Sequence, residues 1–248
     1  MKRIVTVFSF STIAVLLFSC FCFAWGARPV PMEIRPLGVL DDEDYQQLKI
    51  VANQAPARVG ERVGAVCAPT QVYYVDSGYD FSKAKSIYIP DFESHDPRAD
   101  ERVTSNVADE LGELLKKKAI FERVERSQPS DADIELRAVV AKYQGITGSQ
   151  TAKAMVTGTA YCGFYQAEIR IIDTKSEKKI GAIQINHITA RAGGIFTWAG
   201  SRRPETQIPG FLASMLEKMK AGQTAWTSAI AFDCTRDDGT DLMDSICK

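Results

Sequence analysis

The chain has 248 residues, of which 45% are hydrophobic and 25% are charged, values that are ordinary for a globular protein. The formal net charge of −1 at pH 7 argues against broad electrostatic capture of nucleic acid or of an anionic membrane. Beyond the N-terminus, no apolar run is long enough to span a bilayer. The composition therefore indicates one large domain, or one domain with a substantial extension.

Residues 1–26 have the layout of a bacterial export signal. A basic tip, Lys2-Arg3, precedes an uncharged apolar run that ends at Ala24, and prolines follow soon after. Small residues at its end favour cleavage near residue 26, whereas Leu17-Phe18-Ser19-Cys20 resembles a lipobox in which the Cys20 thiol would be acylated. An uncleaved anchor is the third alternative. We expect an exported protein in the periplasm or at the outer membrane, which meets the membrane only through a lipid anchor if Cys20 is acylated.

Export changes how the other cysteines are interpreted. Two cysteines lie within the signal, which leaves an even set of four in an oxidising compartment. Such a set favours two disulfide bonds, with three possible connectivities. We expect Cys234 to pair with Cys247, because the polar segment between them needs a cross-link, and Cys67 to pair with Cys162. No spacing fits a zinc template, so neither a metal site nor a cofactor is predicted.

Residues 27–81 form a predicted N-terminal extension. After a proline-rich lead-in, acidic residues 41–44 precede an apolar pattern that predicts a short helix with acid at the positive end of its dipole. A cation-binding acidic cluster is the functional alternative. Residues 72–75 are either a strand or a segment packed beside the core, and turn-forming residues 76–80 mark the boundary of the extension.

Residues 82–233 form the predicted α/β domain. Its helix has an apolar stripe that includes Val107 and Leu111, and Asp96 and Pro97 are placed to begin it. Alternation of apolar and polar residues predicts the longer strands. The expected elements are a strand at 86–92, the helix, strands at 121–126 and 133–143, a hairpin at 165–189 and a second helix at 211–219.

Candidate catalytic residues are few. His187 shares parity with Ile183 and Ile185, so a core or edge histidine is favoured over a ligand or a general base. Asp91, Asp131 and Asp133 are interpreted as strand-end and turn residues, which leaves no convergent pair of acids for a hydrolase. No catalytic residue is therefore predicted.

Two glycine-containing loops are the candidate partner surfaces. The first runs from residue 148 to residue 158 and is also consistent with a plain hairpin connection. The second carries aromatic residues, which suit a binding surface if the loop exposes them. It also carries two adjacent arginines, which suit an acidic partner. Its alternative is a loop that its aromatics hold against the core. The residues of this second surface are Ile195, Phe196, Trp198, Arg202 and Arg203.

The order β-α-β-β-β-β-α predicts an α/β fold, a mixed sheet packed by two main helices, followed by a disulfide-linked tail at 234–248. Three segments, Lys85–Phe92, Ala119–Val124 and Asp131–Leu136, resemble the DUF4410 group of bacterial envelope proteins of unknown function. More distantly, the order is similar to the periplasmic domains of the CsgG and LpoB families. The resemblance covers about residues 82–221, and the sequence departs from the lipoprotein pattern at Phe18.

The resemblance implies a non-enzymatic role at protein interfaces, because those relatives assemble pores or activate cell-wall synthases. We expect an exported envelope protein that binds another protein, with no catalytic residue to carry over. The alternatives are a subunit of an oligomeric outer-membrane assembly, and a hydrolase acting on wall or secreted substrates.

Overall fold

The computed structural model describes most of the chain after the predicted signal. The signal and Cys20 lie outside the described part. The described residues are 34, 36–54, 66–68, 71–127, 131–145, 161–191, 203–227 and 233–235.

Eight strands form one mixed sheet in the order β5-β3-β6-β7-β8-β2-β9, with β4 also paired to β6. Strands β3, β4, β5 and β6 are parallel to one another, and the remaining pairs are antiparallel. This arrangement confirms the predicted α/β class. The strands are β2 (Gln71–Val75), β3 (Ser86–Tyr88), β4 (Glu93–Ser94), β5 (Arg123–Glu125), β6 (Ile134–Gln144), β7 (Tyr161–Asp173), β8 (Lys178–Arg191) and β9 (Ala225–Thr227).

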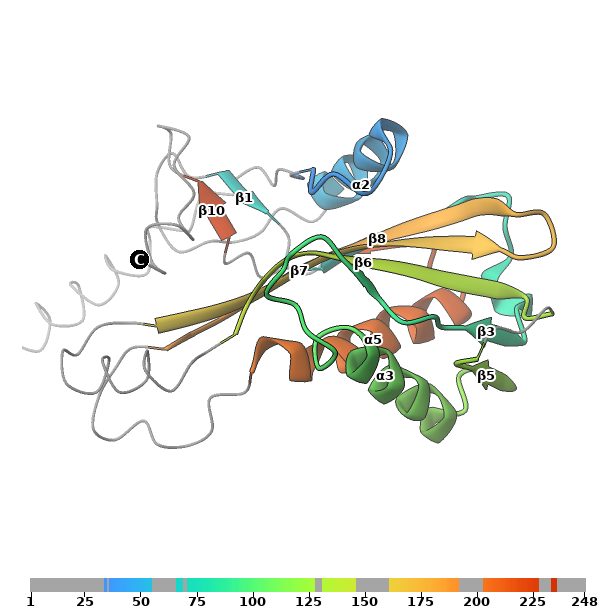
Figure 1. Ribbon diagram of the computed structural model, residues 1–248. Helices are drawn as coiled ribbons and strands as arrows, with labels where there is room; N and C mark the ends of the chain where they lie inside the picture. The colour runs from blue at the N-terminus through green and yellow to red at the C-terminus, as the bar shows by residue number, and fades with distance from the viewer. Residues whose placement is uncertain are drawn as a thin grey trace, which may run out of the picture.

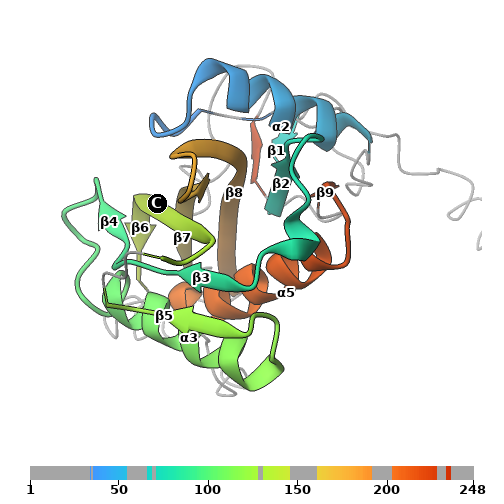
Figure 2. The ribbon, with the colours of Figure 1, turned by 90° about the vertical axis from the view of Figure 1, so that its right-hand side faces the viewer.

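Helices cover both faces of this sheet. Figure 1 and Figure 2 show α3 (Ser105–Lys118) and α5 (Ile208–Lys220) on one face and α2 (Asp42–Gln54) on the other. Short 3-10 helices η1 (Phe81–Lys83) and η2 (Pro204–Gln207) precede β3 and α5. A separate two-stranded ribbon pairs β1 (Val66–Ala68) with β10 (Asp233–Thr235). The two main helices are those that the sequence predicts, and α2 is the short helix expected in the extension.

The main core lies between the sheet and the pair α3–α5. The predicted stripe of α3 is buried there, with Val107 and Leu111 at 2% exposure or less, and α5 contributes Leu212 and Leu216. The lysines in the last turn of α3 interact favourably with the negative end of the helix dipole, and Ala119 ends α3 in the left-handed conformation at φ 51°. Apolar burial on this face stabilises the fold by about 25 cal/mol per Å² of apolar surface removed from water.

The start of α3 differs from the expectation. The helix begins at Ser105, and residues 97–104 form turns instead of helix. Asp96 is occupied elsewhere: its carboxylate accepts hydrogen bonds from the backbone of Arg98 and from the backbone N–H of Tyr143 on β6. The predicted cap is therefore wrong, because the same side chain serves a turn and a strand edge.

The predicted boundary at residue 82 falls between two elements of one sheet. Strand β2 belongs to the extension, yet it lies between β8 and β9. Its close approach to β8 depends on Gly181, where a Cβ atom would lie 2.4 Å from the carbonyl oxygen of Tyr74. The extension therefore supplies part of the main sheet.

The extension is held on the second face by a buried carboxylate. Glu168 of β7 is 0% exposed, although the alternation of apolar and polar residues along this strand predicts that it faces solvent. Its side chain accepts five hydrogen bonds, which we call the Glu168 cluster. The donors are the backbone N–H groups of Leu37 (3.2 Å), Val39 (3.0 Å) and Leu40 (3.2 Å), the hydroxyl of Tyr45 (2.9 Å) and Nε2 of Gln184 (2.8 Å).

A second buried acid fixes the start of α2. Asp44 is 0% exposed and accepts hydrogen bonds from the backbone N–H of Asp41 (3.1 Å) and the hydroxyl of Tyr74 (2.5 Å). The ammonium group of Lys179 on β8 lies 2.7 Å from the same carboxylate. The acidic cluster of the sequence is thus a helix start that is ion-paired to the sheet.

We predict that Glu168→Gln lowers the free energy of unfolding by about 2–4 kcal/mol, because an amide NH₂ would face backbone N–H groups inside a dry site. Urea titration at pH 7 measures the change. Glu110→Gln on the exposed side of α3 is the matched control and should change stability by less than about 0.5 kcal/mol. Equal effects of the two substitutions would contradict a structural role for the Glu168 cluster.

Candidate partner-binding site

Three buried rings form a row across the face of the sheet that α3 and α5 cover. Tyr143 of β6 is the register partner of Tyr165 on β7, which is in turn the register partner of His187 on β8. All three are at most 8% exposed, and the two tyrosine rings meet edge to face with centroids 6.3 Å apart. Directly opposed positions share one face of a sheet, so the strand alternation itself builds this ring row.

The ring row fixes η2 and the start of α5 to the sheet. The hydroxyl of Tyr143 donates to the buried Glu205 of η2 at 3.0 Å. Nε2 of His187 lies 3.0 Å from Nε2 of Gln207, and the imidazole packs edge to face against Phe211 at 4.9 Å. These contacts hold the chain in place directly after residue 202.

The ring row is neutral near pH 7. Burial lowers the pKa of His187 to about 4, so its uncharged ring accepts a hydrogen bond at Nε2 from the Gln207 amide. Burial also raises the pKa of Tyr143 and Tyr165 well above the usual range. A histidine with so low a pKa is a weak general base, which agrees with the expectation of a core histidine.

Asp96 covers the exposed edge of β6 beside the ring row. Its carboxylate accepts the Tyr143 backbone N–H at 2.8 Å and binds the Arg98 guanidinium through two hydrogen bonds of 2.9 and 2.7 Å. The Arg98 hydrogen bonds, together with the backbone donors, lower the pKa of Asp96 to about 2. Arg98 in turn lies 5.8 Å over the ring of Phe164. A side chain thus supplies the acceptor that a further strand would otherwise provide.

Both predicted partner loops leave the sheet at the same end. Strand β6 ends at Gln144 opposite Phe164, and β7 begins at Tyr161 opposite Arg191, where β8 ends. We call this the loop end of the sheet. Of the second predicted surface, Arg203 is exposed and directly precedes the buried Pro204. Its other four residues, Ile195, Phe196, Trp198 and Arg202, lie outside the described part.

The three acids weighed as catalytic candidates are each engaged in structural contacts. Asp91 is ion-paired with Arg126, whose hydrogen bond holds the pKa of Asp91 below its usual value. Asp131 accepts from Arg123 at 3.2 Å. At neutral pH the lowered pKa of Asp91 excludes this carboxylate as a general acid.

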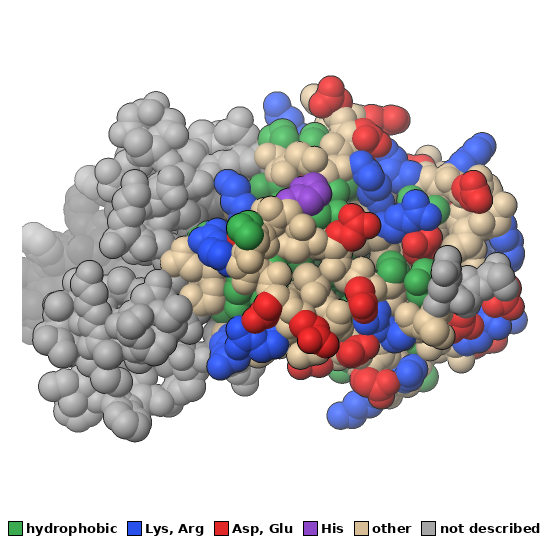
Figure 3. All heavy atoms as spheres, in the orientation of Figure 1, with side chains coloured by type: hydrophobic (Ala, Val, Ile, Leu, Met, Phe, Trp, Pro, Cys, Tyr) green, Lys and Arg blue, Asp and Glu red, His purple; other side chains and the backbone are tan. Residues whose placement is uncertain are grey.

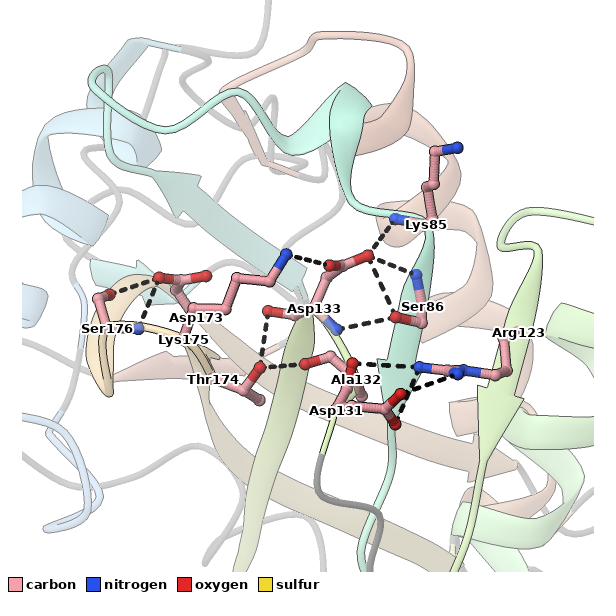
Figure 4. A network of polar contacts seen from close by, with 10 residues as sticks. All are labelled: Lys85, Ser86, Arg123, Asp131, Ala132, Asp133, Asp173, Thr174, Lys175 and Ser176. Carbon is pink, nitrogen blue, oxygen red and sulfur yellow. Dashed lines mark hydrogen bonds and ion pairs between the residues drawn. The ribbon is translucent and has the colours of Figure 1, made fainter.

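Asp133 joins three elements at the opposite end of the sheet, as Figure 4 shows. Its Oδ2 accepts from the backbone N–H groups of Lys85 (2.7 Å) and Ser86 (3.0 Å), and its Oδ1 accepts from the ammonium of Lys175 (2.8 Å). The Lys175 contact and these backbone donors place the pKa of Asp133 far below its usual range. The starts of β3 and β6 are thereby tied to the β7–β8 turn.

A basic cavity lies beside the C-terminal end of α3. It has a volume of about 500 Å³ and is lined by Phe121 and by three lysines among other residues. The lysines already have partners: Lys220 donates to the carbonyl oxygen of Ser82 at 2.6 Å, Lys116 to Glu113 at 2.9 Å, and Lys85 lies 3.5 Å from Glu122. Its charges are therefore committed within the protein.

Within the described residues, three further features would indicate other functions: a metal site, a membrane-spanning helix and a surface of one charge sign. Across these residues, no group of three or more His, Cys, Asp and Glu side chains lies close enough to hold a metal ion. Nor is any helix in the described ranges long and apolar enough to cross a membrane. On the face shown in Figure 3, positive and negative side chains are interspersed. That face carries no broad field of one sign to attract nucleic acid.

Comparison with known proteins leaves the family open. No protein-family model and no curated protein matches the chain. Among solved structures, the chain is similar to the PelC dodecamer from Paraburkholderia phytofirmans, with a TM-score of 0.38, 11% identity and coverage of 60% of this chain and 96% of that chain. It is also similar to lipoprotein GNA1162 from Neisseria meningitidis, with a TM-score of 0.33, 13% identity and coverage of 55% and 98%. At these values the similarity carries no statement about function.

The sequence did not point to Glu205, Gln207 or Asp96 as anchors of the loop end. Glu205 and Gln207 lie in a short 3-10 helix with no periodic pattern, and Asp96 looks like a helix cap. Neither feature separates these residues from solvated ones in the sequence, because Asp96 and Glu205 act through contacts with Tyr143, which is distant in the chain.

We predict that Asp96→Asn lowers the free energy of unfolding by about 2 kcal/mol at pH 7, from the displacement of its pKa to about 2. A depressed carboxyl pKa stabilises the folded state above the unfolded pKa of about 4, and that contribution is lost as pH falls through about 2. The difference between wild type and variant should therefore shrink to below about 0.5 kcal/mol at pH 2.

Urea titration between pH 2 and pH 7 measures this dependence. Glu93→Gln on the neighbouring strand β4, where the side chain is exposed, is the control and should show a small effect at every pH. A difference for Asp96→Asn that stays constant down to pH 2 would exclude the ionised carboxylate as its cause.

Proposed function

We propose that the chain is an exported bacterial envelope protein that acts by binding another protein at the loop end of the sheet, and that it is not an enzyme. The observation that carries this proposal is the convergence of both predicted partner loops on one end, beside residues that fix their attachment points. Interaction sites on loops work best when a rigid scaffold holds the loop ends.

The rigidity of the attachment points comes from buried polar contacts. Glu205 bonded to Tyr143, and Gln207 beside His187, hold η2 against the sheet directly after Arg203. On the neighbouring edge, Asp96 holds the end of β6. Breaking such a contact would leave a buried polar group without its partner, which costs about 1–3 kcal/mol.

Export and the non-enzymatic role rest on two further observations. The layout of residues 1–26 is that of a secretory signal, with Cys20 as a lipidation candidate. The carboxylates of Asp91, Asp131 and Asp133 are each bound to a basic side chain or to backbone donors. Membership of the DUF4410 group is part of the same proposal.

A second candidate function is that of a subunit in an oligomeric outer-membrane assembly. The described sheet favours this alternative less, because its edge strands β5 and β9 have only three residues each. Short edge strands are a common way of preventing further strand addition. Self-association would then have to use a surface other than these strand edges, and the loop end is one such surface.

We predict that a photoreactive phenylalanine analogue at Arg203 cross-links to a different envelope protein in intact cells. The same analogue at Lys178, exposed at the opposite end of the hairpin, is the matched control and should give no adduct. Mass spectrometry of the adducts identifies the partner. An adduct of twice the chain's mass would support the oligomeric alternative, and equal labelling from both positions would contradict a site at the loop end.

A further inference from the structure

We propose that Cys67 and Cys234 form a disulfide bond that joins the N-terminal extension to the C-terminal tail. The bond would lie in the two-stranded ribbon of β1 and β10. These strands pair antiparallel with Val66 opposite Thr235, Cys67 opposite Cys234 and Ala68 opposite Asp233. The two cysteines are therefore direct register partners, although they lie 167 positions apart in the sequence.

The register meets the geometric requirement of a disulfide. Directly opposed residues of an antiparallel pair have Cα atoms about 4.5–5.5 Å apart, and their side chains share one face of the ribbon. A disulfide needs Cα atoms about 4.4–6.8 Å apart. Opposed positions in such a ribbon thus satisfy the distance without movement of the backbone.

The small size of the ribbon gives the bond a structural purpose. Each strand has three residues, and an isolated two-stranded ribbon is at best marginally stable in water. Its strands also come from segments far apart in the chain, so their pairing costs loop-closure entropy. A covalent link that restricts the unfolded chain offsets this cost.

The alternative pairing of Cys67 with Cys162 is less consistent with the strand register. Cys162 lies in β7 of the main sheet, and its register partner on β8 is Ala190. Because one sulfur forms one disulfide, a bond from Cys67 to Cys234 excludes both bonds expected from the sequence. It would leave Cys162 and Cys247 as the remaining pair, of which Cys247 lies outside the described part.

The reaction is an ordinary two-electron oxidation. Both thiols lose a proton, one sulfur–sulfur bond forms, and two electrons pass to the disulfide of an envelope thiol oxidase, which is reduced to its dithiol. Export, as proposed above, supplies such a compartment. The bond then ties the segment before β2 to the segment after β9, and these two strands are neighbours at one edge of the main sheet.

Peptide mapping under non-reducing conditions tests the bond directly on the full protein purified from its envelope. Free thiols are first blocked with iodoacetamide, and the protein is then cut with trypsin, which cleaves after lysine and arginine. The four cysteines then fall in four different peptides: 63–83, 154–170, 221–236 and 237–248. We expect 63–83 linked to 221–236, with a mass two hydrogens below the sum of the two peptides.

Three results would overturn the proposal: a link from 63–83 to 154–170, a link from 221–236 to 237–248, or alkylated thiols in both 63–83 and 221–236. A paired variant test uses stability. Reduction should lower the melting temperature of the Cys162→Ser/Cys247→Ser variant by roughly 5–15 °C. Reduction should leave the melting temperature of a variant in which Cys67, Cys162, Cys234 and Cys247 are all replaced by Ser unchanged, and equal shifts in these two variants would contradict the assignment.

Discussion

A carboxylate that is fully buried must be satisfied, and the structure depends on how Glu168 meets that requirement. Three backbone N–H groups from residues 37–40, a tyrosine hydroxyl and a glutamine amide surround it. The desolvation cost of an ionised carboxylate is several kcal/mol, so β7 can carry this residue only while the extension lies on it. The extension is thus a layer of the domain, and the sheet has helices on both faces.

This layer also determines where the chain enters the domain. Residues 36–40 are already fixed to the sheet, soon after the predicted end of the signal at residue 26. Whether the mature chain begins at an acylated Cys20 or near residue 26, only a short segment would separate its first residue from the folded part. Under the proposed function, a partner at the loop end would therefore meet the domain in the periplasm or close to the membrane.

The sequence was sufficient for the elements with strong periodicity. The stripe of α3, the hairpin of β7 and β8, and helix α5 are all predicted from the sequence, because apolar spacing dictates which face is buried. The same alternation could not show what covers the other face. Glu168 and Gln166 occupy polar positions of β7, yet both are buried, at 0% and 9% exposure. The burial of Glu168 depends on a segment over a hundred residues away, which local patterns do not encode. At the loop end, the sequence predicts the two loops but not the residues that hold their attachment points, because Asp96 and Glu205 act through tertiary contacts.

The account rests on export of a chain whose extension is part of the fold, and the intact mass of the protein recovered from cell fractions tests this most directly. We expect the protein in the envelope fraction, with a mass that begins at a lipidated Cys20 or at a residue near Trp25 to Ala27. A chain that retains Met1 and is recovered from the cytoplasm would contradict the account, because neither the oxidising compartment nor the envelope partner would then be accessible to it.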